Sequence, residues 1–218
     1  MGFFLRQTCK IFKCSFSSRA LMIKKLSFIF GSKTKAQEIA LLLQDVKEVV
    51  RQGFFAHELA KVEKFCAENN LFLVRSNFKV LFGDEEIYSN KGLRISESDK
   101  RPGMYFVYVS KEEQKAWLAS YYELVHNHKD LGLLLGYPPC CVDFFCSKFT
   151  PQNTNLEIPS KNPYTNLSKR EQDIVIISHF PCNSECQESI NLGEKYLQAM
   201  YAFDKERARE LLMRLRAE

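Results

Sequence analysis

Hydrophobic residues recur at intervals of three or four positions along residues 33–69. Leu43, Val46 and Val50 belong to one such run, and a second run follows Gly53. A repeat of this period places apolar side chains on one face of an α-helix. Because glycine disfavours a helix interior, the pattern predicts two helices that are separated at Gly53.

The middle of the chain consists of short stretches that are rich in aromatic and β-branched residues. Residues 104–109 fit a strand, and residues 71–82 fit either one strand or two short strands broken near Ser76 and Asn77. A weaker strand pair surrounds Asn90 and Gly92. Pro102 belongs to another turn signal, just before the last of these stretches. The pattern therefore predicts a small antiparallel sheet.

Helical periodicity returns at Ser110, which has capping-box spacing to Glu113. Further helices are expected over residues 130–136 and from residue 184 to the end, with a break near Phe203. The intervening residues 151–167 are rich in Asn, Pro, Ser and Thr, and predict a long loop. The apolar face of the helix that begins at Ser110 is expected to comprise Trp117, Leu118, Tyr121, Leu124 and Val125.

These elements predict an α+β fold with N-terminal helices, a small antiparallel sheet and a helical C-terminal half that carries the candidate site. The chain has 218 residues, of which 45% are hydrophobic and 26% charged, as is typical of a globular protein. We expect one domain over residues 33–218, preceded by a disordered basic arm over residues 1–32.

The net charge of +5 is unevenly distributed along the chain. The first 37 residues hold many basic and no acidic side chains, so an argument for nucleic-acid binding from charge rests on the arm alone. No run of 18 apolar residues is present, so no membrane span is predicted. We expect a cytoplasmic protein, with an organellar presequence in residues 1–21 as the alternative.

Eight cysteines are many for this length, and four of them form two close pairs. The apolar content suffices for a core and no clean signal peptide is visible, which argues against a secreted disulfide scaffold. In a reducing compartment, paired cysteines indicate metal binding or thiol chemistry. The cysteines expected to lie outside the site are Cys9, Cys14 and Cys66.

Both pairs fall where helices are expected to begin. Pro139 favours the first turn of a helix, which places the first pair in that turn. Asn183 or Ser184 suits the N-cap of the last long helix, with Cys186 in its first turn. Free backbone N–H groups and the helix dipole favour a thiolate at such positions.

The predicted metal ligands are Cys140, Cys141, Cys182 and Cys186. The metal is expected to be zinc or an iron–sulfur cluster, although the spacing differs from the C-x2-C knuckles of a zinc ribbon. Neighbouring side chains on a helix point about 100° apart. One of the two adjacent cysteines is therefore expected to face elsewhere, and Cys146 or His179 would complete the set.

A metal-free thiol enzyme, either an oxidoreductase or a transferase, is the first alternative. Its catalytic residues would be Cys182 or Cys141 as the attacking thiol and His179 as a proton shuttle. The sequence does not decide whether the protein is an enzyme. Weaker candidates for a role beside the thiols are His126, His128, Asp143 and Glu185.

A module that binds RNA or a protein partner, with a purely structural metal, is the second alternative. It rests on the basic arm and on the arginines of the last helix, where interleaved glutamates favour a merely solvated face. The expected substrate is a small molecule or an RNA.

The stretch LGLLLGYPPCCVDFF over residues 131–145, followed by HFPCNSECQES over residues 179–189, resembles a family of archaeal and bacterial proteins called domain of unknown function 483. The similarity spans about residues 105–197, under half of the chain. It implies no reaction. The signature that it implies comprises Tyr137, Pro138, Cys140, Cys141, Pro181, Cys182 and Cys186.

Overall fold

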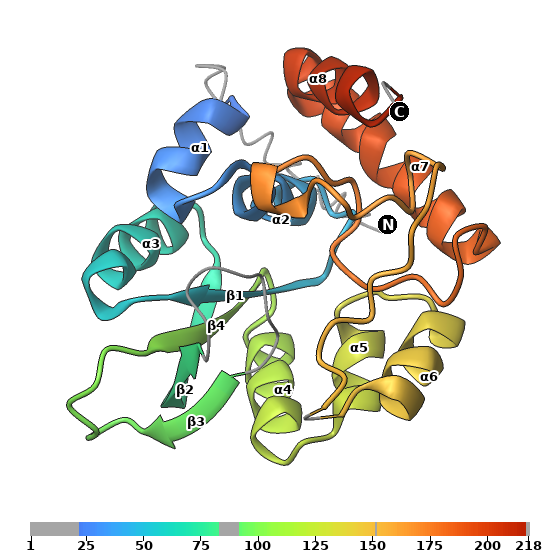
Figure 1. The fold of residues 1–218 in the computed structure, drawn as a ribbon. Helices are drawn as coiled ribbons and strands as arrows, with labels where there is room; N and C mark the ends of the chain where they lie inside the picture. Colours follow the sequence, from blue (N-terminus) through green and yellow to red (C-terminus); the bar gives the residue numbers. More distant parts are fainter. Residues whose placement is uncertain (1–21, 83–91, 151, 217–218) are drawn as a thin grey trace, which may run out of the picture.

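The computed structural model describes residues 22–82, 92–150 and 152–216 (Figure 1). Its helices are α1 (Ile23–Phe30), α2 (Lys33–Leu43), α3 (Ala56–Glu68), α4 (Glu113–Leu124), α5 (His128–Leu134), α6 (Pro139–Lys148), α7 (Gln187–Phe203) and α8 (Lys205–Arg216), with a 3-10 turn at Arg170–Gln172. Its strands are β1 (Val49–Phe54), β2 (Phe72–Phe82), β3 (Gly92–Ser96) and β4 (Met104–Ser110). The predicted α+β class is confirmed.

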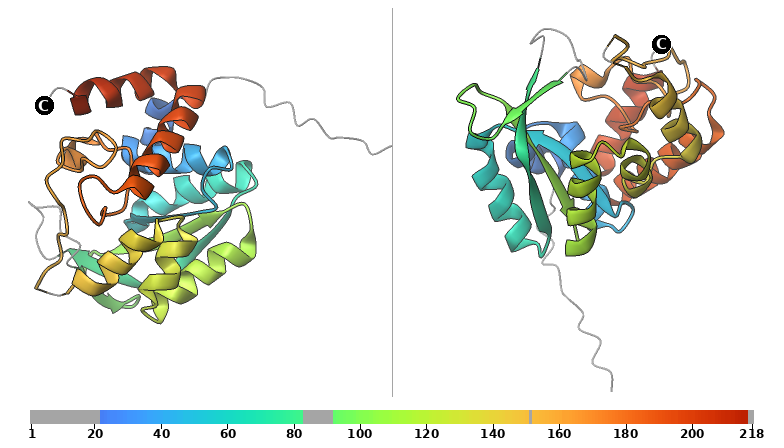
Figure 2. Two further views of the ribbon diagram at one scale, coloured as in Figure 1. Left: turned by 90° about the vertical axis from the view of Figure 1, so that its right-hand side faces the viewer. Right: turned by 90° about the horizontal axis from the view of Figure 1, so that it is seen from below.

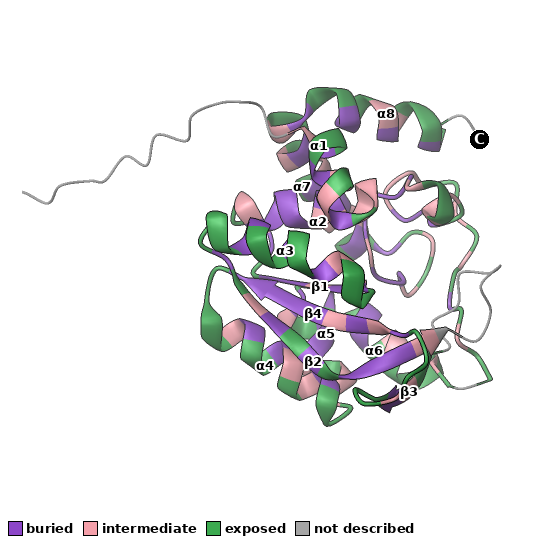
Figure 3. Cartoon of the chain, turned by 90° about the vertical axis from the view of Figure 1, so that its left-hand side faces the viewer, coloured by how far each residue is buried: buried purple, intermediate pink, exposed green. Residues whose placement is uncertain are grey.

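The four strands form one antiparallel sheet in the order β1-β4-β2-β3. Successive strand residues point to opposite faces, so Val107 and Val109 of β4 pack toward α1, α2 and α3, whereas Tyr108 packs toward α4 and α5. Figures 1 and 3 show these helices on the two sides of the sheet, with the buried positions turned inward. The sheet is thus the middle layer of the N-terminal half.

A separate apolar cluster forms beside the sheet from α2, α7, α8 and the irregular chain before α7. Leu156, Leu167, Ile174 and Ile177 are buried in it, although residues 152–186 contain no strand and no α-helix. Figure 2 shows this irregular segment beside α5 and α6. The cluster holds the loop against the helices and so positions the second cysteine pair.

The helix predicted around Val50 is wrong. Val49–Phe54 is the edge strand β1, which pairs with β4 from Val49↔Ser110 to Phe54↔Tyr105. Val49 and Val50 are β-branched and suit a strand, and the pairing partner lies some 60 residues away, outside the reach of local periodicity. Gly53 lies within the strand and does not separate two helices.

The boundary of the N-terminal arm is also corrected. Residues 22–32 belong to the folded part, because Ile23, Leu26 and Phe30 of α1 are buried against α2 and α3. The predicted domain start at residue 33 is therefore too late. Residues 1–21, with Cys9 and Cys14, lie outside the described residues, as does the turn at Asn90.

Helix α4 presents an unexpected face to the sheet. Ala116, Ala119 and Glu123 are buried, whereas the large residues predicted to pack, among them Trp117 and Tyr121, are exposed. Glu123 accepts hydrogen bonds from the guanidinium groups of two arginines of the sheet, which turns that side of the helix inward. The predicted capping box is wrong as well, because the Ser110 hydroxyl in β4 donates to the Glu48 carbonyl.

Candidate metal centre

The first cysteine pair lies at the start of α6, as predicted. Gly136 has a φ of +78°, a conformation that glycine adopts at little cost, and it turns the chain after α5. Pro138 is the N-cap and Pro139 the first helical residue. Gly132 of α5 lets α6 approach closely, since a Cβ there would lie 2.9 Å from Val142 Cγ2. The packed helix pair fixes the direction in which the cysteines project.

The second pair lies on the segment that enters α7. The Thr165 hydroxyl donates to the Ser184 carbonyl at 2.6 Å, and the Asn183 side chain accepts from the Glu185 N–H at 3.0 Å. This turn delays the helix, so Cys186 itself is the N-cap of α7. The prediction that Asn183 or Ser184 caps the helix, with Cys186 in its first turn, is wrong by two to three residues.

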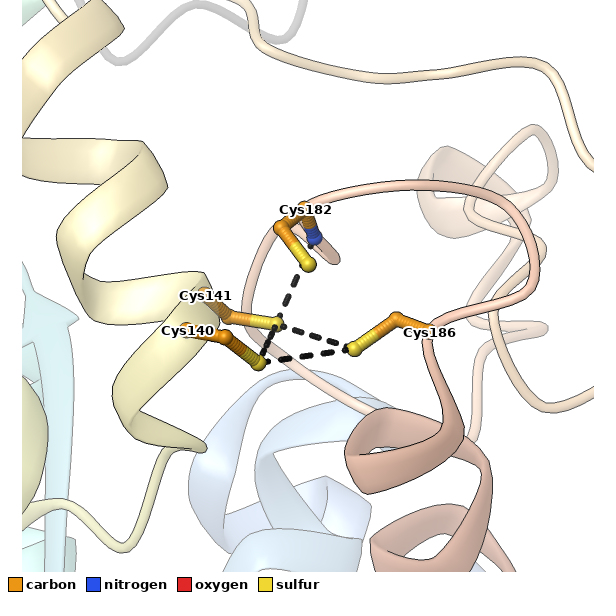
Figure 4. A group of neighbouring side chains, drawn as sticks. All are labelled: Cys140, Cys141, Cys182 and Cys186. Carbon is orange, nitrogen blue, oxygen red and sulfur yellow. Dashed lines mark hydrogen bonds between the residues drawn. The ribbon is translucent and has the colours of Figure 1, made fainter.

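The four sulfur atoms converge between the N-terminal ends of α6 and α7 (Figure 4). The Sγ atoms of Cys140 and Cys141 are 3.8 Å apart, and they lie 3.7 Å and 3.6 Å from Cys186 Sγ. All four Sγ atoms, that of Cys182 included, lie within 4.8 Å of one another. Four thiols in this arrangement can hold a metal ion.

The expectation that Cys140 and Cys141 face different directions is wrong. Figure 4 shows both side chains extending from the first turn of α6 toward Cys186. The adjacent residues can converge because the meeting point lies off the end of the helix, next to the entering loop. Cys140 is exposed, whereas Cys141 and Cys186 are buried, so one side of the centre faces solvent.

Hydrogen-bond donors surround the sulfur atoms. The Cys182 N–H donates to Cys141 Sγ at 3.3 Å, and the Asn183 amide donates to Cys182 Sγ at 3.4 Å. Cys186 Sγ lies beside the start of α7, where hydrogen bonding from Ser189 lowers the pKa of the thiol. Donors of this kind stabilise the thiolate form of a cysteine, because a hydrogen bond to the charged sulfur neutralises part of its charge.

The thiols of the two helix starts differ in acidity. Burial raises the pKa of Cys141, and burial together with its hydrogen bond to Cys186 raises the pKa of Cys140 to about 11. Burial acts in the same direction on Cys186, but the hydrogen bonds from Ser189, Cys182 and Cys141 outweigh it and lower that pKa to about 7. Without a cation, Cys140 and Cys141 are therefore protonated at neutral pH.

One family comparison covers the centre. Residues 116–213 match the family described as protein of unknown function (DUF483). The match confirms the resemblance noted in the sequence, and it extends from α4 into α8 with all four cysteines inside it. No curated protein and no solved structure shows a significant match to the chain.

Residues 116–213 are called the DUF483 segment, and its other predicted residues lie away from the four sulfur atoms. Cys146 is exposed near the Lys129–Asp143 ion pair. His126 forms a hydrogen bond with Arg94, and Glu185 accepts one from Asn162. These residues are not part of the four-cysteine group. Cys66, outside the segment, is a buried core residue as expected.

Two buried polar residues lie directly behind the sulfurs. One is the predicted candidate His179, whose Nε2 atom forms a hydrogen bond with the Ser189 hydroxyl. That hydroxyl in turn contacts Cys141 Sγ. Sequence reasoning missed Ser189. The available signal was its position three residues after Cys186, where the third residue of a helix faces the N-cap.

Among the described residues, no helix combines the length and the apolar character needed to cross a lipid bilayer.

Proposed function

We propose that this chain binds one zinc ion through the thiolates of Cys140, Cys141, Cys182 and Cys186. The observation that carries the proposal is the spacing of the sulfur atoms. Zinc–sulfur bonds of about 2.3 Å in a tetrahedron put neighbouring sulfurs about 3.8 Å apart. The three Sγ separations given above, 3.6, 3.7 and 3.8 Å, match that edge.

The same spacing favours a single ion over an iron–sulfur cluster. In a cluster, each thiolate binds an iron at the corner of a core of several atoms. The cysteine sulfurs then stand farther apart than they do around one ion. Four sulfurs within 4.8 Å of one another leave no space for such a core.

The centre would be structural. Four protein ligands close the tetrahedron, whereas a catalytic zinc keeps an open position for water or substrate. The ion would join the start of α6 to the start of α7 and fasten the irregular residues 152–186 between them. The DUF483 segment would then be a zinc-stabilised module.

Metal analysis of protein that is purified without air tests the proposal. We expect one zinc per chain, retained in Cys146→Ser and lost in Cys141→Ser and Cys186→Ser. Cys146 is the matched control because it lies on the same helix, outside the four-cysteine group. Protein that is folded and metal-free, or that carries several irons per chain, would overturn the proposal.

A second function, thiol-dependent redox or transfer chemistry, is favoured by the position of Cys186 Sγ, which lies 3.7 Å from Cys140 Sγ and 3.6 Å from Cys141 Sγ. The pKa of Cys186 is lowered to about 7, so this thiol is half ionised at neutral pH without metal. Alkylation of the metal-free protein from pH 5 to 9 should then show Cys186 becoming reactive at a lower pH than the other cysteines. Equal reactivity of all the cysteines would exclude this function.

Binding of RNA remains a prediction that no feature of the described chain favours. Arg207 in α8 is buried and donates to Glu210, Gln37 and the Asp173 carbonyl. Arg214 donates to Gln172. Two of the arginines that motivated the hypothesis thus hold α8 against the body of the protein.

A further inference from the structure

Three buried groups form a continuous chain behind the metal centre. The Ser189 hydroxyl lies 3.1 Å from Cys141 Sγ and 2.8 Å from His179 Nε2. Ser189 is completely buried, and Cys141 and His179 are 2% and 6% exposed. Water therefore does not compete for these contacts, so their hydrogens must be shared among the three groups.

The donors and acceptors fit only one direction around a metal-bound thiolate. A thiolate accepts and does not donate, so the single Ser189 hydrogen points toward sulfur. The Ser189 oxygen then accepts from His179, whose hydrogen is on Nε2. His179 Nδ1 has no partner among the described residues, as suits a ring nitrogen that carries only a lone pair.

The surroundings keep the His179 ring neutral and fixed. Burial, together with the nearby cations Lys47 and Arg170, lowers the pKa of His179 to about 3. The Tyr137 ring lies against His179, with ring centroids 5.1 Å apart. Lys47 forms an ion pair with Glu38, and its Nζ atom lies 5.2 Å from the centroid of the Tyr137 ring. The imidazole is therefore held in place by the Tyr137 ring and by its hydrogen bond to Ser189, and not by the sulfur atoms themselves.

We propose that Ser189 and His179 are positioning residues of the metal centre, with His179 orienting the Ser189 hydroxyl and Ser189 holding the Cys141 thiolate on the ion. The hydrogen bonds from His179 through Ser189 to Cys141 are called the relay, and the inference rests on the proposed zinc site. Partners that orient a ligand in this way typically change metal affinity by about 10- to 100-fold when they are removed. Loss of the hydroxyl should thus make the zinc more labile without removing any ligand.

The test is the rate at which zinc passes from the intact protein to an excess of chelator. We expect Ser189→Ala to release zinc about 10-fold faster, and His179→Leu to accelerate release less, because its effect passes through Ser189. The double variant should release zinc no faster than Ser189→Ala alone, since removal of Ser189 already interrupts the relay. His179→Gln, which restores an N–H near the Nε2 position, should recover a slow rate.

Cobalt(II) gives a readout that loss of packing alone would not change. In Ser189→Ala loaded with cobalt, the sulfur-to-metal charge-transfer band should shift, since one thiolate loses a hydrogen bond. The matched control is Ser110→Ala, because Ser110 is also buried and donates to the Glu48 carbonyl, far from the sulfur atoms. This control should leave both the release rate and the band unchanged.

The outcomes separate the two proposals. A chain that binds no zinc overturns both. A chain that binds one zinc, but releases it equally fast with and without the Ser189 hydroxyl, overturns the relay and leaves the zinc site standing. If Ser189→Ala does not fold, the His179→Leu and His179→Gln pair decides, and equal rates for these two variants overturn the relay.

Discussion

The sheet and the irregular residues 152–186 are stabilised in different ways. Strands β1 to β4 are tied by continuous backbone pairing and covered by helices on both faces. Residues 152–186 bury several apolar side chains, yet no strand or α-helix organises their backbone. Regular hydrogen bonding suffices for the first region. The second region has no such backbone pairing. The first cysteine pair lies at the start of α6, the helix that precedes this region, and the second pair lies at its C-terminal end.

Removal of zinc is expected to have the largest effect and to separate the two regions. Chelation should release residues 152–186 and the starts of α6 and α7 while the sheet stays folded. A ligand that is present at 1,000 times its Kd contributes about 4 kcal/mol to stability. Hydrogen exchange with and without chelator measures the change by region. Uniform loss of protection across the sheet would contradict the separation.

A core substitution in the sheet is expected to destabilise the sheet while the zinc site stays intact. Phe54 is fully buried, and its ring contacts that of Phe30 in α1. Phe54→Ala should lower the free energy of unfolding by about 3–5 kcal/mol. Denaturation monitored together with metal analysis checks this, and the folded variant should still hold one zinc. Loss of zinc at unchanged stability would show that the regions are not independent.

The ion pairs under α4 should contribute less, and in a pH-dependent way. Burial opposes ionisation of Glu123, but Arg51 and Arg94 outweigh it and lower the Glu123 pKa below its ordinary value of 4.5. A depressed pKa contributes stability above pH 4.5 that is lost as the pH falls through the folded-state pKa. Glu123→Gln should cost about 2 kcal/mol at pH 7. The difference from the wild type should shrink in acid, and a constant difference from pH 7 to pH 3 would refute this account of the pair.

The raised pKa values of two thiols predict that zinc affinity depends on pH. Burial raises the pKa of both Cys140 and Cys141, so these thiols must lose protons when the metal binds. Zinc affinity should rise with pH around neutrality, by about tenfold per pH unit for each proton released. Titration calorimetry in buffers of different ionisation enthalpy counts these protons. Binding without proton release would mean that all four thiols are already ionised.

Local signals in the sequence predicted the fold where the determinants are local. The strands around residues 72–82 and 104–110 were recognised from their composition, and the start of α6 from Pro139. The adjacent and spaced cysteine pairs also identified the candidate site. Each of these features depends on residues within one turn or one strand of each other.

The rest of the fold depends on contacts that periodicity does not contain. Val49 and Val50 form a strand because β4 pairs with them, and α4 turns Glu123 inward because Arg51 and Arg94 lie beneath it. Ser189 faces the cysteines because α7 begins after Cys186, two to three residues later than the local capping signals predict. Strand pairing over long distances and exact helix ends therefore could not be predicted from the local pattern of residues.

X-ray absorption at the zinc edge of the intact protein tests the central claim most directly. The account predicts one zinc per chain surrounded by four sulfur atoms at about 2.3 Å, with no second metal nearby. Nitrogen or oxygen ligands in place of any sulfur, or an iron signal with metal neighbours, would contradict it.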